Sequence, residues 1–181
     1  MTIVTRRTLV IPYTESFESE FLILNCCAKN RAQLNGPQTV SAAREQFKRV
    51  LHDDSLYAMA VLDNYNREFM GHVFVQAEDG RAELGFIFDK AYWGQGLASE
   101  ALQAFFAKAC ARLNLTAVTA RTSLSNYAAI AILHKLGFQL SATRQDAFGS
   151  YYAFEWQQTE PSGAEHDFIA FGAAAGGMPA A

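Results

Sequence analysis

The strongest constraint on the fold is the segment FIFDKAYWGQGLASEAL, residues 86–102, in which a strand pattern passes into a helix pattern across two glycines. Apolar residues recur at helical spacing directly after Gly96. Glycines allow the backbone to turn tightly and to approach a ligand closely. The first N–H groups of a helix lack intrahelical acceptors and, together with the helix dipole, favour a bound anion. We therefore interpret residues 93–99 as a cradle for a ligand that carries a pyrophosphate.

Two other glycine motifs fit this segment less well, and a plain tight turn is the structural alternative to all of them. A dinucleotide-binding GxGxxG needs a third glycine where Ser99 stands. It also needs an acidic residue about twenty positions later, where residues 114–119 have none. A P-loop needs Lys and then Ser or Thr after its last glycine, where Leu97 and Ala98 stand. The sequence thus favours a pyrophosphate cradle over both of these motifs.

The apolar periodicity around this segment predicts an α/β fold of the α+β type. Three consecutive strands, 57–62, 69–76 and 81–88, form a meander, and Asp79-Gly80 is a hairpin signal. The helix after the glycines leads to a further strand by a right-handed crossover, which places two parallel strands in a mixed sheet. The other predicted elements are a strand at 7–13, a helix that is capped by Thr14 and extends to Ala28, a helix around 43–51, a strand at 115–123, a helix from Asn126 to Gly137, and two closing strands.

The composition describes a globular protein. Half of the 181 residues are apolar, and the net charge of −3 argues against nucleic acid as a partner because phosphate binding needs a basic surface. No run approaches the ~20 apolar residues of a membrane span, and the N-terminus lacks a signal-peptide pattern. We therefore expect a cytoplasmic protein without a membrane partner. The three cysteines and four histidines form no disulfide framework or ligand pattern, so we expect no metal.

The composition changes after Thr159. Residues 1–158 carry the strand and helix patterns, whereas EPSGAEHDFIAFGAAAGGMPAA is rich in alanine and glycine. We expect a single domain over 1–158 and a flexible tail over 159–181 outside its core.

Trp93-Gly94-Gln95-Gly96-Leu97-Ala98 resembles the R/Q-x-x-G-x-G/A coenzyme A motif of the GNAT acetyltransferase superfamily. The segments TRRTLVI, AELGFIF and SEAL, followed by Asn126 and HKLGF, resemble its RimJ/RimL-type branch. The resemblance covers about residues 5–157. It implies a GNAT-like fold, in which a twisted, mixed and mostly antiparallel sheet is flanked by helices and two central parallel strands splay apart.

The resemblance also implies that acetyl-CoA is the co-substrate. Its pantetheine arm would lie between the splayed strands, 83–88 and 117–122, and the loop 93–99 would hold its pyrophosphate. Asn126 resembles the family's Asn near the pantetheine or acetyl group. The coenzyme-binding residues implied in this way are Phe86, Ile87, Phe88, Trp93, Gly94, Gln95, Gly96, Leu97, Ala98, Ser99 and Asn126.

Three positions depart from the family pattern. Trp93 replaces Arg or Gln, Ala129 stands where Ser is frequent, and Leu133 stands where many members carry a Tyr that could protonate the leaving thiolate. A thiol with an ordinary pKa of about 8.5 can leave without a dedicated acid. The departures therefore affect single residues more than the family assignment.

Glu83 is the candidate general base, and Asn126 is the second residue predicted to act at the reaction centre. By strand alternation the Glu83 side chain points to the same face as Gly85 and Ile87. An α-amino group, with a pKa of about 7.7–8.0, is partly neutral at cellular pH, so a carboxylate that acts through a water is sufficient. The structural alternatives for Glu83 are an exposed strand carboxylate and a salt bridge. A backbone N–H near Ile87 or Phe88 is expected to hold the developing oxyanion.

The preferred interpretation is an N-acetyltransferase that transfers an acetyl group from acetyl-CoA to a primary amine, either a protein N-terminus or a small molecule. The alternative is a non-catalytic module that binds or senses acyl-CoA. Release of free coenzyme in the presence of an amine distinguishes the two. Relatives suggest a homodimer, whereas the sequence itself does not set the oligomeric state.

Overall fold

The computed structural model describes residues 1–160, so the tail expected over 159–181 lies almost wholly outside the described residues. Eight strands form one sheet in the order β1-β2-β3-β4-β5-β6-β8-β7. In chain order the elements are β1 (Ile3–Val4), β2 (Thr8–Pro12), the 3-10 turn η1 (Glu15–Phe17), α1 (Glu18–Cys26), α2 (Val40–His52), β3 (Leu56–Asp63), β4 (Phe69–Glu78), β5 (Arg81–Phe88), the 3-10 turn η2 (Lys90–Tyr92), α3 (Leu97–Leu113), β6 (Ala117–Ser123), α4 (Tyr127–Lys135), β7 (Gln139–Asp146) and β8 (Gly149–Gln157).

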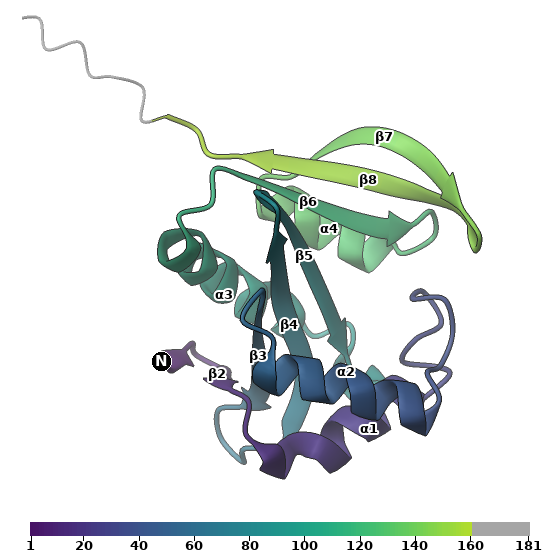
Figure 1. The fold of residues 1–181 in the computed structure, drawn as a ribbon. Coiled ribbons are helices and arrows are strands. Elements are labelled where there is room, and N and C mark those ends of the chain that lie inside the picture. Colours follow the sequence, from purple (N-terminus) through teal and green to yellow (C-terminus); the bar gives the residue numbers. More distant parts are fainter. Residues whose placement is uncertain (161–181) are drawn as a thin grey trace, which may run out of the picture.

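The sheet splits at its centre. Neighbouring strands are antiparallel except for β5 and β6, which are parallel and pair only at Glu83 and Thr119. On its other side β5 pairs with β4 along its whole length, from Arg81 to Phe88. Beyond Glu83 the two parallel strands diverge, as Figure 1 shows. The predicted mixed sheet and its splayed parallel pair are confirmed, and the divergence leaves backbone groups of β5 free for a ligand.

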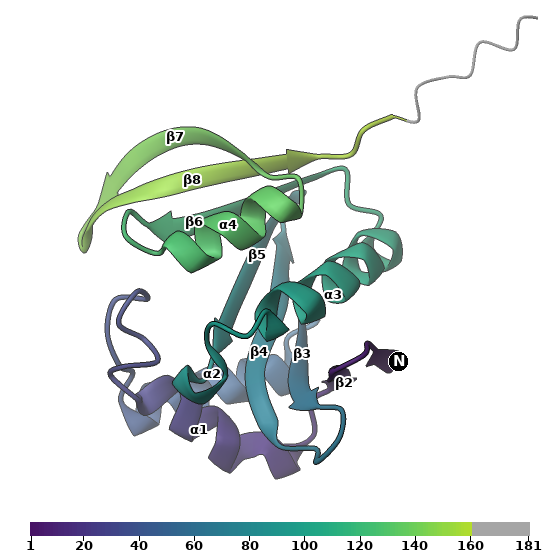
Figure 2. The ribbon, with the colours of Figure 1, turned by 180° about the vertical axis from the view of Figure 1, so that it is seen from behind.

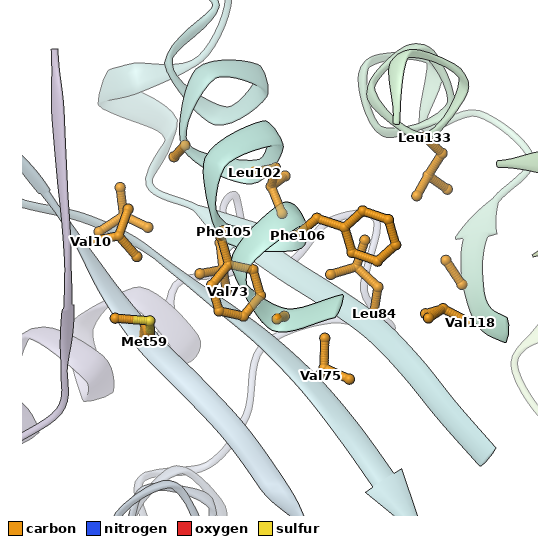
Figure 3. Close-up of a cluster of buried hydrophobic side chains, with 14 of the residues drawn as sticks. Val10, Met59, Val73, Val75, Leu84, Leu102, Phe105, Phe106, Val118 and Leu133 are labelled. Atoms are coloured by element: carbon orange, nitrogen blue, oxygen red, sulfur yellow. The ribbon is translucent and has the colours of Figure 1, made fainter. Parts of the chain in front are cut away.

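The helices cover the two faces of the sheet in pairs. Figures 1 and 2 show α1 and α2 on one face and α3 and α4 on the opposite face. On the α3 side, Leu102, Phe105 and Phe106 point from α3 toward the strands (Figure 3). Full burial of such a side chain contributes about 1.5–3 kcal/mol. Other members of this core are Val10, Met59, Val73, Val75, Leu84, Val118 and Leu133, and a second cluster contains Phe21, Phe47, Val50 and Leu56.

Glycines shape strand β5 at its start and in its middle, and the turn at its start is the predicted hairpin. Asp79 and Gly80 connect β4 to β5 with φ values of 51° and 75°, the pair of positive angles that a type I′ hairpin turn requires. Gly85 pairs with Phe74 of the neighbouring strand, and a Cβ atom at Gly85 would lie 2.1 Å from the Phe74 Cζ. The missing side chain at Gly85 therefore lets the Phe74 ring lie across β5.

The start of the chain differs from the prediction in three places. Strand β1 was not predicted, because two residues are too few to show a pattern. Thr14 does not cap an α-helix: its hydroxyl bonds the Ser16 hydroxyl at 2.6 Å, and a 3-10 turn precedes α1. Helix α1 ends at Cys26, so Ala28 lies in the following loop. No helix among residues 1–160 combines the length and the apolar character that a membrane crossing requires.

Candidate functional site

The glycine loop has the backbone that the sequence predicted. Gly94 and Gly96 have φ values of 73° and 74°, in the left-handed region that side chains disfavour. Gly96 is the N-cap of α3 and has no side chain that could accept a hydrogen bond from the first turn. The backbone N–H groups of Leu97, Ala98 and Ser99 make no hydrogen bond within the described residues. These free donors lie at the positive end of a helix of 17 residues, which fits a phosphate-bearing ligand.

Arg7 fixes this loop from the N-terminal segment. Its Nη1 donates to the Gln95 carbonyl at 2.8 Å, and its Nε donates to Glu100 Oε1 at 3.0 Å. The Arg7 backbone N–H at 2.8 Å and the Thr5 hydroxyl at 2.6 Å both donate to Glu100 Oε2. Burial opposes ionisation of Glu100, but these hydrogen bonds and the Arg7 charge outweigh it and lower the pKa of the carboxyl group. Arg7 was not predicted as a site residue. The one sequence feature that points to it is its position in TRRTLVI, a segment that resembles the family.

A cavity of about 520 Å³ extends from the glycine loop to the end of β5. It gathers ten of the eleven predicted coenzyme-binding residues; Gln95 is not part of its wall, and the carbonyl of Gln95 bonds Arg7 instead. Trp93 is held beside the cavity because its Nε1 donates to the Phe88 carbonyl at 2.8 Å. The wall includes Phe86, Ile87, Phe88, Trp93, Gly94, Gly96, Leu97, Ala98, Ser99 and Asn126.

A second cavity of about 390 Å³ lies on the α1 side of the same strands. It contains Glu83, and it shares Phe86, Ile87 and Asn126 with the first cavity. The two cavities therefore meet where β5 and β6 separate. A ligand in each would bring two molecules together near the C-terminal end of β5.

Glu83 forms a salt bridge, which was one of its two structural alternatives. Its Oε1 accepts from Arg121 Nη2 at 3.1 Å and from Arg121 Nε at 3.2 Å, and both side chains are partly exposed. The Arg121 guanidinium also lies 5.7 Å from the centre of the Tyr151 ring.

Asn126 caps α4 as predicted, because its Oδ1 accepts the Ala129 N–H at 3.2 Å. Glu83 and Asn126 both line the second cavity, and their catalytic roles stay predictions.

His72 is a wall residue that the sequence analysis did not select. Full burial lowers its pKa to about 3, so the imidazole is neutral at physiological pH. Tyr13 lies next to it, with its hydroxyl 2.9 Å from His72 Nδ1, and burial raises the Tyr13 pKa well above the usual value. Tyr13 therefore keeps its proton, and a hydrogen bond joins its hydroxyl group to the neutral imidazole.

The loop between α1 and α2 covers the junction of the two cavities. Gln33 and Leu34 contribute to both walls. Gln33 Oε1 accepts from the Ser125 hydroxyl at 3.0 Å and from the Ser123 hydroxyl, so the loop is tied to the turn before α4. Among residues 1–160, no group of three or more His, Cys, Asp or Glu side chains is arranged to hold a metal ion.

Residues 7–139 match the acetyltransferase (GNAT) domain, so the chain belongs to the GNAT acetyltransferase family. Over 76 residues it is 34% identical to the uncharacterized N-acetyltransferase p20 of Bacillus licheniformis. That match covers 42% of this chain and 43% of the relative, so the chain spans less than half the length of the curated relative it matches.

Two solved structures illustrate the likeness of fold. The spermidine N-acetyltransferase of Vibrio cholerae, in complex with CoA and spermine, aligns with a TM-score of 0.75 and 14% identity, covering 85% of this chain and 97% of that one. The Salmonella typhimurium acetyltransferase that modifies the N-terminal serine of ribosomal protein L7/L12 aligns with a TM-score of 0.72 and 18% identity, covering 88% and 100%.

Proposed function

We propose that this protein is an acetyl-CoA-dependent N-acetyltransferase that transfers an acetyl group to a primary amine. The observation that carries the proposal is the meeting of the two cavities at Phe86, Ile87 and Asn126. One cavity ends in a glycine loop with free N–H groups, and the other contains Glu83. Family membership supports the reaction class, and the two structural neighbours act on different amines. A peptide N-terminus and a small amine both remain candidates.

Acetyl-CoA would bind in the larger cavity as a substrate. The N–H groups of Leu97, Ala98 and Ser99 would hold its diphosphate, and several such bonds together would supply the affinity. The free edge of β5 beyond Glu83 would bind its pantetheine arm, so the thioester would lie near Ile87. These residues fit the ligand because Gly94 and Gly96 carry no side chains and the N–H groups of Leu97, Ala98 and Ser99 have no acceptor among residues 1–160.

The amine would bind in the second cavity and attack across the junction. Its nitrogen forms a bond to the acyl carbon, the carbon–sulfur bond breaks, and the amine proton passes through a water to the Glu83 carboxylate. The electron pair of the carbon–sulfur bond leaves on sulfur, and the CoA thiolate takes a proton from solvent. The products are the N-acetylated amine and the CoA thiol. A backbone N–H near Ile87 or Phe88 would stabilise the negative charge on the acyl oxygen. Most of the acceleration would come from holding the two substrates together.

Thiol release from acetyl-CoA with a panel of amines tests the proposal. Acetyl-CoA at about 100 times its Kd adds roughly 2.7 kcal/mol to stability, which a melting curve detects before any assay of turnover. We expect binding and amine-dependent thiol release. Binding without release from any amine would favour the alternative, a non-catalytic acyl-CoA-binding module.

Glu83→Gln tests the general base. We expect a fall in kcat/KM of about 10²–10⁴-fold, the usual contribution of a positioned base. Arg121→Gln is the matched control, because it breaks the same ion pair and leaves the carboxylate in place. If Glu83→Gln keeps full kcat/KM across the pH range, Glu83 is not the base and its pairing with Arg121 is structural.

Several finer points stay predictions of the sequence. They are the cytoplasmic location, the homodimer, the single domain over 1–158, and the lack of nucleic-acid and membrane partners. Sedimentation of the full chain checks the oligomeric state.

A further inference from the structure

Arg31 is a cation in the wall of the second cavity that the mechanism does not use. It lies in the loop after α1 and is half-buried. Its Nε donates to the Gly36 carbonyl at 2.8 Å, its Nη1 to Asn25 Oδ1 at 3.1 Å, and its Nη2 to the Leu34 carbonyl at 2.8 Å. All three acceptors are neutral, so these bonds fix the orientation of the guanidinium without neutralising it.

No carboxylate among residues 1–160 forms an ion pair with Arg31. Burial lowers its pKa, but a guanidinium stays charged in proteins. A guanidinium has five N–H donors, and three are used here. One N–H group remains on each of the two terminal nitrogens, and an arginine can use two such donors to bind a carboxylate. A half-buried charge without a counter-ion is costly, and an anionic ligand would remove that cost.

The other charged residues in the wall of the second cavity do not favour binding of a polycationic acceptor. Glu83 is already paired with Arg121. Asp146 is exposed in the β7–β8 hairpin, and its Oδ1 accepts the Phe148 N–H at 2.8 Å. His72 is neutral. The uncompensated charge in the partly buried wall is therefore the positive charge of Arg31, whereas a site for a polyamine would need an excess of carboxylates.

We propose that the acceptor is a small amine that also carries a carboxylate, and that Arg31 binds this carboxylate while the amine points toward the cavity junction. The inference rests on the proposed N-acetyltransferase function and narrows its substrate class. It makes α-amino acids better acceptors than their carboxamides, and polyamines poor acceptors.

The test compares acceptors that differ only in the anionic group. Thiol release from acetyl-CoA is measured with L-alanine, L-phenylalanine, the carboxamides of both, and spermidine, at equal concentrations of neutral amine. We expect kcat/KM for the better amino acid to exceed that for its carboxamide by about tenfold or more, since a hydrogen-bonded charge pair is worth at least that factor. Equal rates for acid and carboxamide, or a preference for spermidine, would overturn the inference.

Variants then assign the preference to Arg31. In Arg31→Gln the ratio between acid and carboxamide should fall to about one while the KM for acetyl-CoA is unchanged, and Arg31→Lys should keep part of it. Arg44→Gln is the matched control, because Arg44 pairs with Glu18 on the surface and lies outside the cavity. An unchanged ratio in a folded Arg31→Gln would contradict the inference. If acetyl-CoA binds and no amine releases thiol, the proposed function fails and this inference with it.

Discussion

At the scale of single residues, the site depends on groups whose surroundings set their chemistry. The rings of Phe21 and Phe74 each lie 5.2 Å from the His72 ring, and the Tyr13 hydroxyl bonds its Nδ1. Burial holds it neutral in the wall of the proposed acceptor cavity. Because its folded pKa is lower than its unfolded pKa, the unfolded chain binds one more proton between the two values. Stability attributable to His72 is therefore lost as the pH falls.

This linkage predicts an acid-dependent loss of stability that belongs to His72. Between pH 6.5 and about 3 its contribution should fall by up to about 1.4 kcal/mol per pH unit. In His72→Leu this part of the slope should disappear, although the variant is less stable at neutral pH because Tyr13 loses its partner. Urea unfolding at pH 4.5 and pH 7 measures the difference. An equal slope in both proteins would mean that His72 is protonated in the folded state.

At the scale of elements, the N-terminal segment and helix α3 form one unit around the glycine loop. Residues with left-handed backbone angles give a loop its shape but do not make it rigid. The bonds from Arg7 to the Gln95 carbonyl and to Glu100 fix the loop on one side. They also offset a negative charge in the first turn of α3, where it would repel a phosphate.

Removing this support should weaken coenzyme binding. We expect Arg7→Ala to raise the Kd for CoA about tenfold, because two charged hydrogen bonds no longer hold the donors in place. Titration calorimetry with CoA measures it, with Arg44→Ala as a control that removes another surface arginine ion pair. A Kd equal to that of the wild type would show that the loop is preorganised without Arg7.

At the scale of the whole molecule, the sequence predicted most of the sheet but not the walls of the second cavity. Strands β2 to β8, the hairpin at Asp79 and the turn at the two glycines carry local signals, and their existence was predicted correctly. The walls of the second cavity come from segments that are far apart in the chain. Arg31, for example, lies in the loop after α1, whereas Arg121 lies in β6. Their meeting depends on how α1 and the following loop pack against the sheet, and no short-range pattern encodes that packing.

The same reason explains the residues that were missed. Arg7, Arg31 and His72 have no motif of their own. Arg7 bonds residues 88 and 93 positions away, His72 is fully buried, and Arg31 lines a cavity whose other walls come from distant segments. Glu83 was selected by strand alternation, which gives its face but not its ion pair with Arg121. Periodicity therefore predicts which side of the sheet a residue occupies, and tertiary packing decides what the residue meets there.

The central claim is that free amides at the start of α3 hold the diphosphate of acetyl-CoA. A crystal structure of the complex with CoA measures this directly. We expect diphosphate oxygens within about 3 Å of the backbone nitrogens of Leu97, Ala98 or Ser99, and the thiol of the bound CoA beside Ile87. A diphosphate bound away from these residues would contradict it.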